Sequence, residues 1–225
     1  MKSKEELKQL HGDEYVEAYE KKLPMRLERL LGYMRLDKTV RAVDFACGNA
    51  MLMELIAPRV KSYTGVDFSE PFIRVANEKK ARLSIENADF VCADINDFCS
   101  QRFQTFDVAF AMDVSEHIYD AEWLATLKSI RSSLKPNGRL YIHTPNAEFF
   151  LERMKDKGII VKQFPEHIAV RTPEHNAALL KDAGFKIEQI RLIPHYNILK
   201  VVHPLSYVPG IGKFLKARIF IEAAA

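Results

Sequence analysis

The chain has 225 residues, of which 48% are hydrophobic, and this is enough for one α/β domain with a sizeable core. Its formal net charge of +3, with 28% charged residues, is close to balance, and we find no local basic patch of the kind that nucleic-acid-binding proteins need. Three cysteines without metal-ligand spacing argue against a disulfide framework and indicate a reducing compartment. Charges stand where a signal peptide would have its apolar core, and no apolar run is long enough to span a bilayer. We therefore expect a cytoplasmic protein.

The chain begins with two predicted helices. Residues 4–22 and 25–36 both have helix-forming composition, and we expect residues 1–38 to form a helical lid over the domain that follows. Tyr15 and Tyr19 lie one helical turn apart. They either fold over a bound ligand or pack against the domain, which is the more common role of such a pair.

From residue 40 onward, short β-type runs alternate with helical stretches. The strands are predicted at residues 41–46, 62–67, 88–93, 106–112, 139–144, 185–193 and 217–221. The helices are predicted at residues 51–59, 70–83 and 121–134, with a later helix from its N-cap Thr172 to Gly184. This alternation implies right-handed crossovers, and therefore an α/β fold with a doubly wound, mostly parallel seven-stranded sheet and helices on both faces. No linker divides residues 39–225, which we expect to form one domain.

Acidic residues end the first three predicted strands. Asp44 precedes a turn of small residues that leads into a helix, and such a junction presents backbone N–H groups to a ligand. Asp67 ends the second strand, where a carboxylate can accept hydrogen bonds from both hydroxyl groups of a ribose. Asp94 ends the third strand, where it can accept from an adenine amino group or simply cap the next helix. The three acids converge on one edge of the sheet, which predicts a site for an adenosine-like ligand.

Five short segments follow one another along these strand ends and turns, namely Val43–Ala50, Gly65–Ser69, Ala93–Ile95, Leu134–Leu140 and Ala183–Phe185. In this order they resemble the motifs of class I S-adenosylmethionine-dependent methyltransferases, and the resemblance covers most of residues 40–222. It implies a Rossmann-like methyltransferase fold with S-adenosylmethionine as the cofactor, its ribose on Asp67 and its adenine beside Asp94. The cofactor-binding residues that the resemblance implies are Asp44, Ala46, Cys47, Gly48, Asn49, Asp67, Phe68, Ser69, Asp94, Ile95, Asn96, Met112, Asp113 and Val114.

The first motif departs from the family pattern at two positions. The family usually has Gly-Cys-Gly-x-Gly there, whereas this chain has Ala46 and Ala50 and keeps only the middle glycine, Gly48. An alanine methyl group is tolerated where the backbone dihedral φ is negative, but it obstructs a close backbone approach where φ is positive. The affinity for the cofactor is therefore expected to depend on φ at the two alanines.

The segment after the fourth strand resembles the part of the family that lies beside the transferable methyl group. His117 is the first candidate for the base that takes the proton of the acceptor, because the unperturbed pKa of histidine lies near neutrality. The spacing of Asp113, Glu116 and His117 is also similar to the Glu-x-x-Glu-His set of small-RNA 2′-O-methyltransferases, which holds a divalent metal together with a distant histidine, here His167. Related segments occur in ubiquinone-pathway O-methyltransferases, and a simple base stays open as the alternative. We expect His143 and His167 to face the acceptor, and His175, in the first turn of the later helix, is either an alternative to His167 or a surface residue, which is the more common role.

The resemblance implies transfer of a methyl group to a small molecule, with a hydroxyl oxygen of a lipid, quinone or sugar as the expected target. Segments near residues 145–172 and 195–216 are expected to cap the acceptor pocket. The second segment is apolar and carries lysines, so it either docks on a membrane or forms a cap or a dimer contact. Two other functions stay open. One is RNA methylation, disfavoured by the lack of an Asn-Pro-Pro-Tyr-type segment, and the other is cofactor binding without catalysis.

Overall fold

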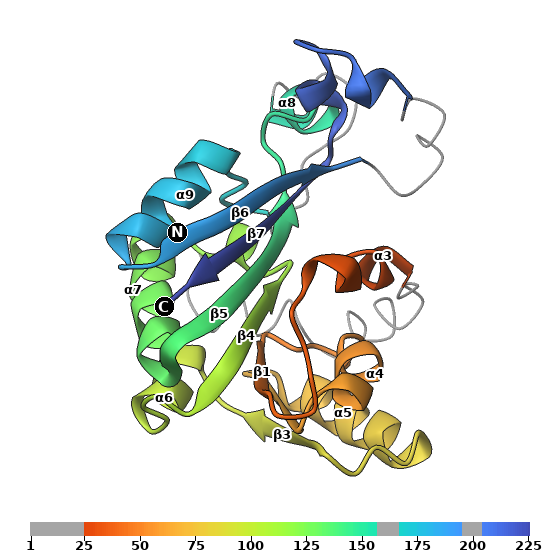
Figure 1. The fold of residues 1–225 in the computed structure, drawn as a ribbon, viewed down its shortest axis with the longest axis vertical. Coiled ribbons are helices and arrows are strands. Elements are labelled where there is room, and N and C mark those ends of the chain that lie inside the picture. Colours follow the sequence, from red (N-terminus) through yellow and green to blue (C-terminus); the bar gives the residue numbers. More distant parts are fainter. Residues whose placement is uncertain (1–24, 157–166, 195–203) are drawn as a thin grey trace.

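A seven-stranded sheet with the strand order β3-β2-β1-β4-β5-β7-β6 forms the centre of the computed structural model (Figure 1). The structure describes residues 25–156, 167–194 and 204–225. The strands are β1 (Arg41–Phe45), β2 (Ser62–Asp67), β3 (Ala88–Cys92), β4 (Phe106–Met112), β5 (Leu134–Pro145), β6 (Lys186–Ile193) and β7 (Arg218–Ala224). Strand β7 runs antiparallel to β5 and β6, and the other neighbouring strands are parallel. The predicted doubly wound, mostly parallel sheet is confirmed.

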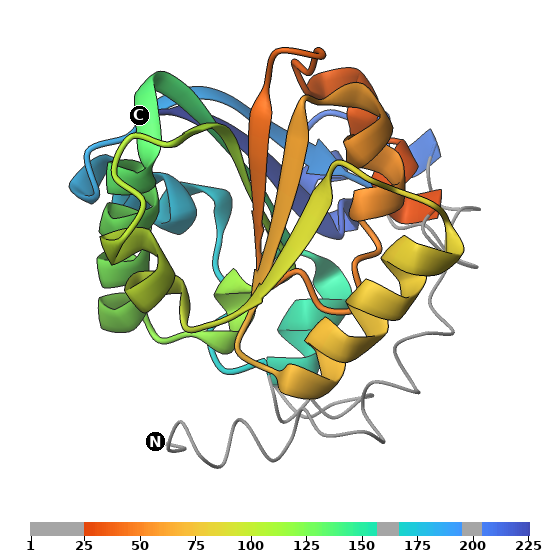
Figure 2. The same ribbon diagram turned by 90° about the horizontal axis from the view of Figure 1, so that it is seen from below.

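Helices cover both faces of the sheet, as the view from below shows (Figure 2). The α-helices are α3 (Met25–Glu28), α4 (Met53–Ile56), α5 (Glu70–Arg82), α6 (Ile95–Ser100), α7 (Asp120–Ser133), α8 (Phe150–Asp156) and α9 (Pro173–Asp182). The 3₁₀-helices are η1 (Leu31–Tyr33), η2 (Ala57–Arg59), η3 (Ser115–His117) and η5 (Gly212–Leu215). Helices α6, α7 and α9 lie on one face, and α3, α4 and α5 lie on the other.

The central strand β1 is buried on both faces, which suits its apolar residues Ala42, Val43 and Phe45. Val43 belongs to the hydrophobic core on the face of α7, together with the fully buried Trp123. Ala42 belongs to the core on the opposite face, together with Met53 of α4. The two cores hold β1 in place and thereby fix the position of the turn that follows it.

Two predicted helices are shorter in the structure than in the prediction. Of the helix predicted over residues 25–36, only the first four residues form an α-helix, α3. The short 3₁₀-helix η1 that follows contains Gly32, which has a low helix propensity. The helix predicted over residues 51–59 is divided into α4 and η2. Pro58 has no N–H group to donate to the carbonyl of Glu54, so the α-helical hydrogen-bond pattern stops before it.

The start of β5 differs from the prediction, whereas the two ends of α9 agree with it. Strand β5 begins at Leu134, earlier than the predicted residue 139, and Asn137 within it has φ +63°, a conformation that asparagine tolerates. The start and end of α9 are confirmed. The Thr172 side chain caps the helix, and Gly184 follows it with φ +88°.

Helix α8 and the segment that contains η5 lie side by side beyond the ends of β5 and β7 (Figure 1). The Lys213 Nζ lies 2.9 Å from the Glu148 carboxylate, and the Arg153 guanidinium lies 5.6 Å from the centre of the Phe214 ring. Parts of the two predicted cap segments are therefore packed against each other at the edge of the sheet where strands β1, β2 and β4 also end.

The predicted helix over residues 4–22, with Tyr15 and Tyr19, lies outside the described residues. Residues 157–166 and 195–203 of the two predicted caps also lie outside them. The helical lid over residues 1–38 stays a prediction.

Candidate active site

Asp67 holds the turn after β1 against the end of β2. Its Oδ2 accepts a hydrogen bond from the Gly48 N–H (3.0 Å), and its Oδ1 accepts one from the Ser69 N–H (2.9 Å). The side chain is buried, and the Cys47 N–H donates to the carbonyl of Val66 in the same strand end. Because an ionised carboxylate has about four acceptor positions, the same group can serve these N–H donors and a ribose diol.

The turn after β1 has left-handed backbone at three alternate residues. The φ angles of Ala46, Gly48 and Ala50 are +54°, +53° and +55°. A side chain added at Gly48 would meet nothing closer than Phe72 Cε1 at 4.0 Å, so this glycine is needed for its backbone conformation and not for space. The two alanines carry the same conformation at a cost of roughly 1–2 kcal/mol each. Both alanines therefore have positive φ, which is the unfavourable one of the two cases considered from the sequence.

We expect the Ala46→Gly substitution to raise the free energy of unfolding by about 0.5–1 kcal/mol, because relief of the left-handed alanine exceeds the added entropy of the unfolded chain. The gain should be smaller for Ala50→Gly, since the methyl group of Ala50 is fully buried in the core. Urea unfolding at equilibrium measures both. The matched control is Ala125→Gly on the exposed side of α7, which should lose about 1 kcal/mol. If Ala46→Gly and Ala125→Gly lowered the free energy of unfolding equally, the backbone strain at Ala46 would be contradicted.

Asp44 is buried next to this turn. The Tyr63 hydroxyl donates to its Oδ2 at 2.5 Å. Burial raises the pKa of Asp44 to about 7, the hydrogen bond from Tyr63 opposes this shift, and the nearby Asp67 charge adds to it. The carboxyl group therefore takes up a proton on folding in the pH range between its unfolded and folded pKa values.

The free energy of unfolding should consequently fall as the pH rises from about 4 to about 7, because the folded state binds the Asp44 proton that the unfolded state has lost. Asp44→Asn has no carboxyl proton, and its amide oxygen can still accept from Tyr63. The melting temperature of this variant should therefore exceed that of the wild type more at pH 8 than at pH 5, as thermal unfolding at both values would show. A difference that is the same at both pH values would contradict this account.

A small cavity of about 40 Å³ lies beside the turn. Predicted cofactor residues from two strand ends line it, including Asp44 in β1, Ala46 and Asn49 after β1, and Met112 at the end of β4. Asn49 is buried, and its Oδ1 has no hydrogen-bond partner among the residues that the structure describes. A buried acceptor without a donor is costly, so this oxygen favours a ligand that brings an N–H or O–H group.

The residues predicted to surround the adenine lie at the ends of β2 and β3. Asp94 accepts a hydrogen bond from the Asn96 N–H (2.9 Å) and caps α6, which is the capping alternative left open by the sequence. Ile95 is half-buried in the first turn of that helix, and Phe68 beyond β2 is exposed. The contact of Asp94 with adenine stays a prediction.

Beyond β4, the chain bends at Asp113, which has φ +56°. The Asp113 Oδ1 accepts from His143 Nδ1 at 2.8 Å and from Arg218 Nη1 at 3.0 Å, so strands β5 and β7 hold the bend in place. His143 is fully buried beneath it and contacts Asp113, and its role toward the acceptor stays a prediction. The next residue, Val114, packs into the core.

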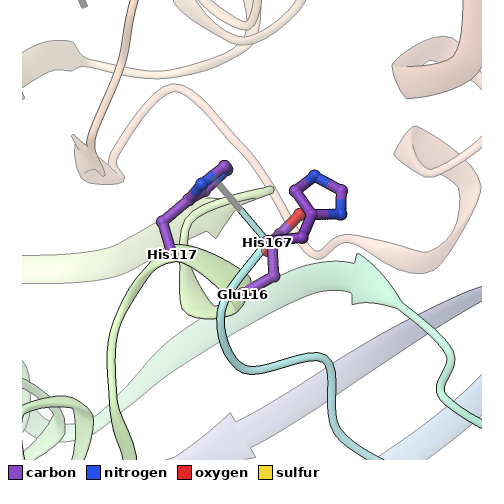
Figure 3. Close-up of side chains that lie close together, drawn as sticks. All are labelled: Glu116, His117 and His167. Atoms are coloured by element: carbon purple, nitrogen blue, oxygen red, sulfur yellow. The ribbon is translucent and has the colours of Figure 1, made fainter. Parts of the chain in front are cut away.

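Three predicted catalytic residues come together after this bend (Figure 3). Ligand atoms of Glu116, His117 and His167 all lie within 4.8 Å of one another, and the centres of the two imidazole rings are 5.2 Å apart. Glu116 is buried and accepts a hydrogen bond from the Thr144 hydroxyl (3.1 Å), which in turn accepts one from the Ser115 hydroxyl (2.9 Å). The cluster joins η3 to the segment before α9.

The environment of this cluster shifts two pKa values. Burial raises the pKa of Glu116 to about 8, the Asp113 charge adds to the shift, and Arg218 opposes it. Burial also lowers the pKa of His167, with Arg218 contributing in the same direction. Asp113 itself, the fourth predicted metal ligand, is not part of the group of three, because its carboxylate is bound to His143 and Arg218.

Several residues around the site have no signal in the sequence. Tyr63 and Thr144 lie within strands β2 and β5 and belong to no motif, and the buried Arg171 follows no motif either. Their contacts join segments far apart in the chain, so only the fold brings them to the site.

The strand order, the acid-held turn after β1 and the polar cluster after β4 are together those of a class I S-adenosylmethionine-dependent methyltransferase. Consistent with this, a family model described as "Methyltransferase domain" matches residues 15–190, and the chain belongs to this family.

Similar proteins include curated relatives and solved structures. The chain is 31% identical over 126 residues to the ubiquinone biosynthesis O-methyltransferase of Coxiella burnetii (strain Dugway 5J108-111), covering 56% of this chain and 52% of the relative. It is 26% identical over 178 residues to the enzyme of the same name from Xanthomonas euvesicatoria pv. vesicatoria (strain 85-10), covering 74% and 71%. The chain thus spans about half the length of the first of these relatives. A structure titled as a SAM dependent methyltransferase from Aquifex aeolicus has a TM-score of 0.66 at 16% identity, covering 94% of this chain and 97% of that one. It shares the fold.

Proposed function

We propose that the protein transfers the methyl group of S-adenosylmethionine to a hydroxyl oxygen of a small-molecule acceptor. The observation that carries the proposal is the placement of two features at one edge of the sheet, the turn held by Asp67 and the cluster of Glu116, His117 and His167. The first suits an adenosine-containing cofactor, and the second suits removal of a proton. The curated relatives are named as O-methyltransferases of ubiquinone biosynthesis, which supports oxygen as the methylated atom.

The reaction is an in-line displacement. A lone pair of the acceptor oxygen forms the bond to the methyl carbon, the bond from that carbon to the sulfonium sulfur breaks, and its electron pair leaves with the now neutral sulfur. The acceptor proton passes to the imidazole of His117. Since the sulfonium is a good leaving group, most of the rate comes from alignment, which can supply roughly 7–11 kcal/mol. His167 and the buried Glu116 fix the position of the base.

The residues fit the parts of S-adenosylmethionine in turn. The Asn49 Oδ1, which has no partner among the described residues, suits the ammonium group, and Asp67 suits the ribose diol. The exposed Phe68 and the half-buried Asp94 lie where the adenine would follow. A cavity of about 40 Å³ has room for one end of the cofactor only, so the adenosine is expected to lie along the strand ends.

The second form of the mechanism uses a divalent metal ion, because Glu116, His117 and His167 offer three ligand atoms in one place. A metal bound there would lower the pKa of a coordinated acceptor hydroxyl. Metal analysis after purification without chelator should then find bound metal in the wild type and less in Glu116→Gln. Full turnover by chelator-treated enzyme would contradict the metal and leave His117 as the base.

Calorimetry with S-adenosylmethionine and its demethylated product tests the proposal first. Binding of both, followed by methylation within a panel of catechols, sugars, quinols and short RNAs, is the expected result, with a catechol such as 3,4-dihydroxybenzoate preferred over RNA. Methylation of RNA alone would replace the small-molecule function. Binding without any turnover would instead favour a non-catalytic cofactor-binding protein.

We also propose that the segment around η5, residues 204–216, binds to the surface of an anionic membrane, from which the enzyme takes a lipid or quinone acceptor. Its apolar side chains Leu205, Tyr207, Val208 and Ile211 are exposed, and Lys213 and Lys216 lie beside them. Exposed apolar groups next to cations are typical of segments that lie in a membrane interface. Among the described residues, no helix has both the length and the apolar character needed to cross a bilayer.

The double substitution Tyr207→Ser and Ile211→Ser is expected to weaken binding to phosphatidylglycerol vesicles by about ten-fold or more, because burial of the two side chains is lost. Co-sedimentation at low salt measures this, with phosphatidylcholine vesicles for comparison. Phe103→Ser is the matched control, since Phe103 is 73% exposed in the turn before β4, apart from this segment. A wild type that binds neither vesicle would leave the segment as a cap or a dimer contact.

A further inference from the structure

Arg171 is a buried cation with three short hydrogen bonds. Its side chain is only 2% exposed, and its Nη1 and Nη2 donate to the carbonyls of Ser115 and Ile118, both at 2.6 Å. Its Nε donates to the Asp120 carboxylate at 2.7 Å. Burial of a guanidinium is costly unless every donor direction is used, and here the planar group spans two carbonyls and a carboxylate at once.

Two partners of the Arg171 side chain, Ser115 and Ile118, belong to the turn that carries Glu116 and His117, and the third, Asp120, is the first residue of α7 just after it. The Ser115 carbonyl also accepts from the Ile118 N–H (3.3 Å) across η3, and the Ile118 carbonyl lies just after the end of η3. The carbonyl between them, that of Glu116, accepts from the N–H groups of Ile168 and Ala169, both at 3.0 Å. The segment that precedes α9 therefore binds this turn through both its backbone and the Arg171 side chain.

His167 is the first described residue of that same segment. The hydrogen bonds of Ile168, Ala169 and Arg171 therefore determine where His167 lies relative to His117, which comes from a part of the chain 50 residues earlier in the printed sequence. The carbonyl of Arg171 also accepts from the Ala147 N–H (3.1 Å), which ties the segment to the end of β5. Without this set of contacts, the two imidazoles belong to independent loops.

We infer that Arg171 is a positioning residue that holds the His167 segment against the η3 turn and so assembles the catalytic cluster. The effect of Arg171 on catalysis rests on the proposed methyl transfer. Its role in holding the His167 segment against the η3 turn does not depend on which acceptor is methylated. A lysine at this position keeps the charge but cannot reach both carbonyls in a plane, and a methionine keeps the volume without any donor.

The experiment compares the wild type with Arg171→Lys and Arg171→Met, each assayed well below its own melting temperature. Hydrogen exchange should become about ten-fold faster at the amides of Ile168 and Ala169 and stay unchanged in β1 and β2. The affinity for S-adenosylmethionine should stay within about two-fold, while turnover of 3,4-dihydroxybenzoate falls by about 30-fold or more in Arg171→Met and by less in Arg171→Lys. The control His175→Ala removes the other contact of Asp120, at 2.9 Å, and should change neither exchange nor turnover.

Unchanged exchange at Ile168 and Ala169 in the lysine variant would overturn the inference. So would a loss of turnover that is matched by an equal loss of cofactor affinity, because a general loss of structure would produce it. If Arg171→Met does not fold, the lysine variant decides alone. A wild type that neither binds the cofactor nor methylates the probe would overturn the proposed function, and the exchange measurement would still decide the role of Arg171.

Discussion

Asp67→Ala is expected to weaken the binding of S-adenosylmethionine by about 100-fold, since two hydrogen bonds to a charged group, worth roughly 1.5 kcal/mol each, are lost with the ribose hydroxyls. The substitution also removes the acceptor that holds the Gly48 and Ser69 N–H groups, so the turn after β1 loses its support. Isothermal calorimetry gives the dissociation constants directly.

The matched control for this substitution is Asp89→Ala. Asp89 lies on the neighbouring strand β3, and its side chain is 85% exposed beside Lys80. The control should bind the cofactor like the wild type. Asp67→Asn should lie between the two, because the amide keeps one acceptor oxygen and loses the charge. A cofactor affinity that is the same in Asp67→Ala and Asp89→Ala would remove Asp67 from the site.

His117→Ala is expected to lower turnover by about 10²- to 10⁴-fold, the usual contribution of a general base, while the affinity for S-adenosylmethionine changes little. The cofactor is assigned to the turn after β1 and to the ends of β2, β3 and β4, whereas His117 lies in η3 against His167 and is not among the predicted cofactor-binding residues. Steady-state kinetics with an acceptor from the panel, combined with calorimetry, separates the two effects.

His167→Ala distinguishes the two forms of the mechanism. If His117 is a simple base, His167→Ala should lose much less turnover than His117→Ala, whereas a metal held by both imidazoles predicts similar losses. His175→Ala serves as a control, because His175 pairs with the exposed Asp120. Turnover that survives in His117→Ala at the wild-type rate would contradict both forms.

The fold could be predicted because each element is encoded by local chemistry. Short β-type runs such as Arg41–Phe45 alternate with helical stretches, and Thr172 with Pro173 defines a helix start. The strand ends that carry Asp44 and Asp67 follow directly from this pattern. The errors lie where a local conformation overrides composition, as at Pro58 within the helix expected over residues 51–59.

The polar network of the site could be predicted only in part. The grouping of Glu116 with His117 is local, and their meeting with His167 was expected only from a resemblance. The pairing of Asp113 with Arg218 joins residues 105 positions apart, so it depends on the place of β7 in the sheet. A sequence pattern shows which acidic residue follows a strand, but not which distant basic side chain will pair with its charge.

The insertion of β7 between β5 and β6 also constrains how the protein is made. Strand β5 leaves the ribosome long before its neighbour β7, and until residues 218–224 are synthesised, its backbone N–H and C=O groups on that side have no strand to pair with. Asp113 likewise awaits its guanidinium partner, which is the first residue of β7. Until β7 is synthesised, a nascent chain thus has an open sheet edge and an incomplete candidate site, a state in which chaperone binding or aggregation competes with folding.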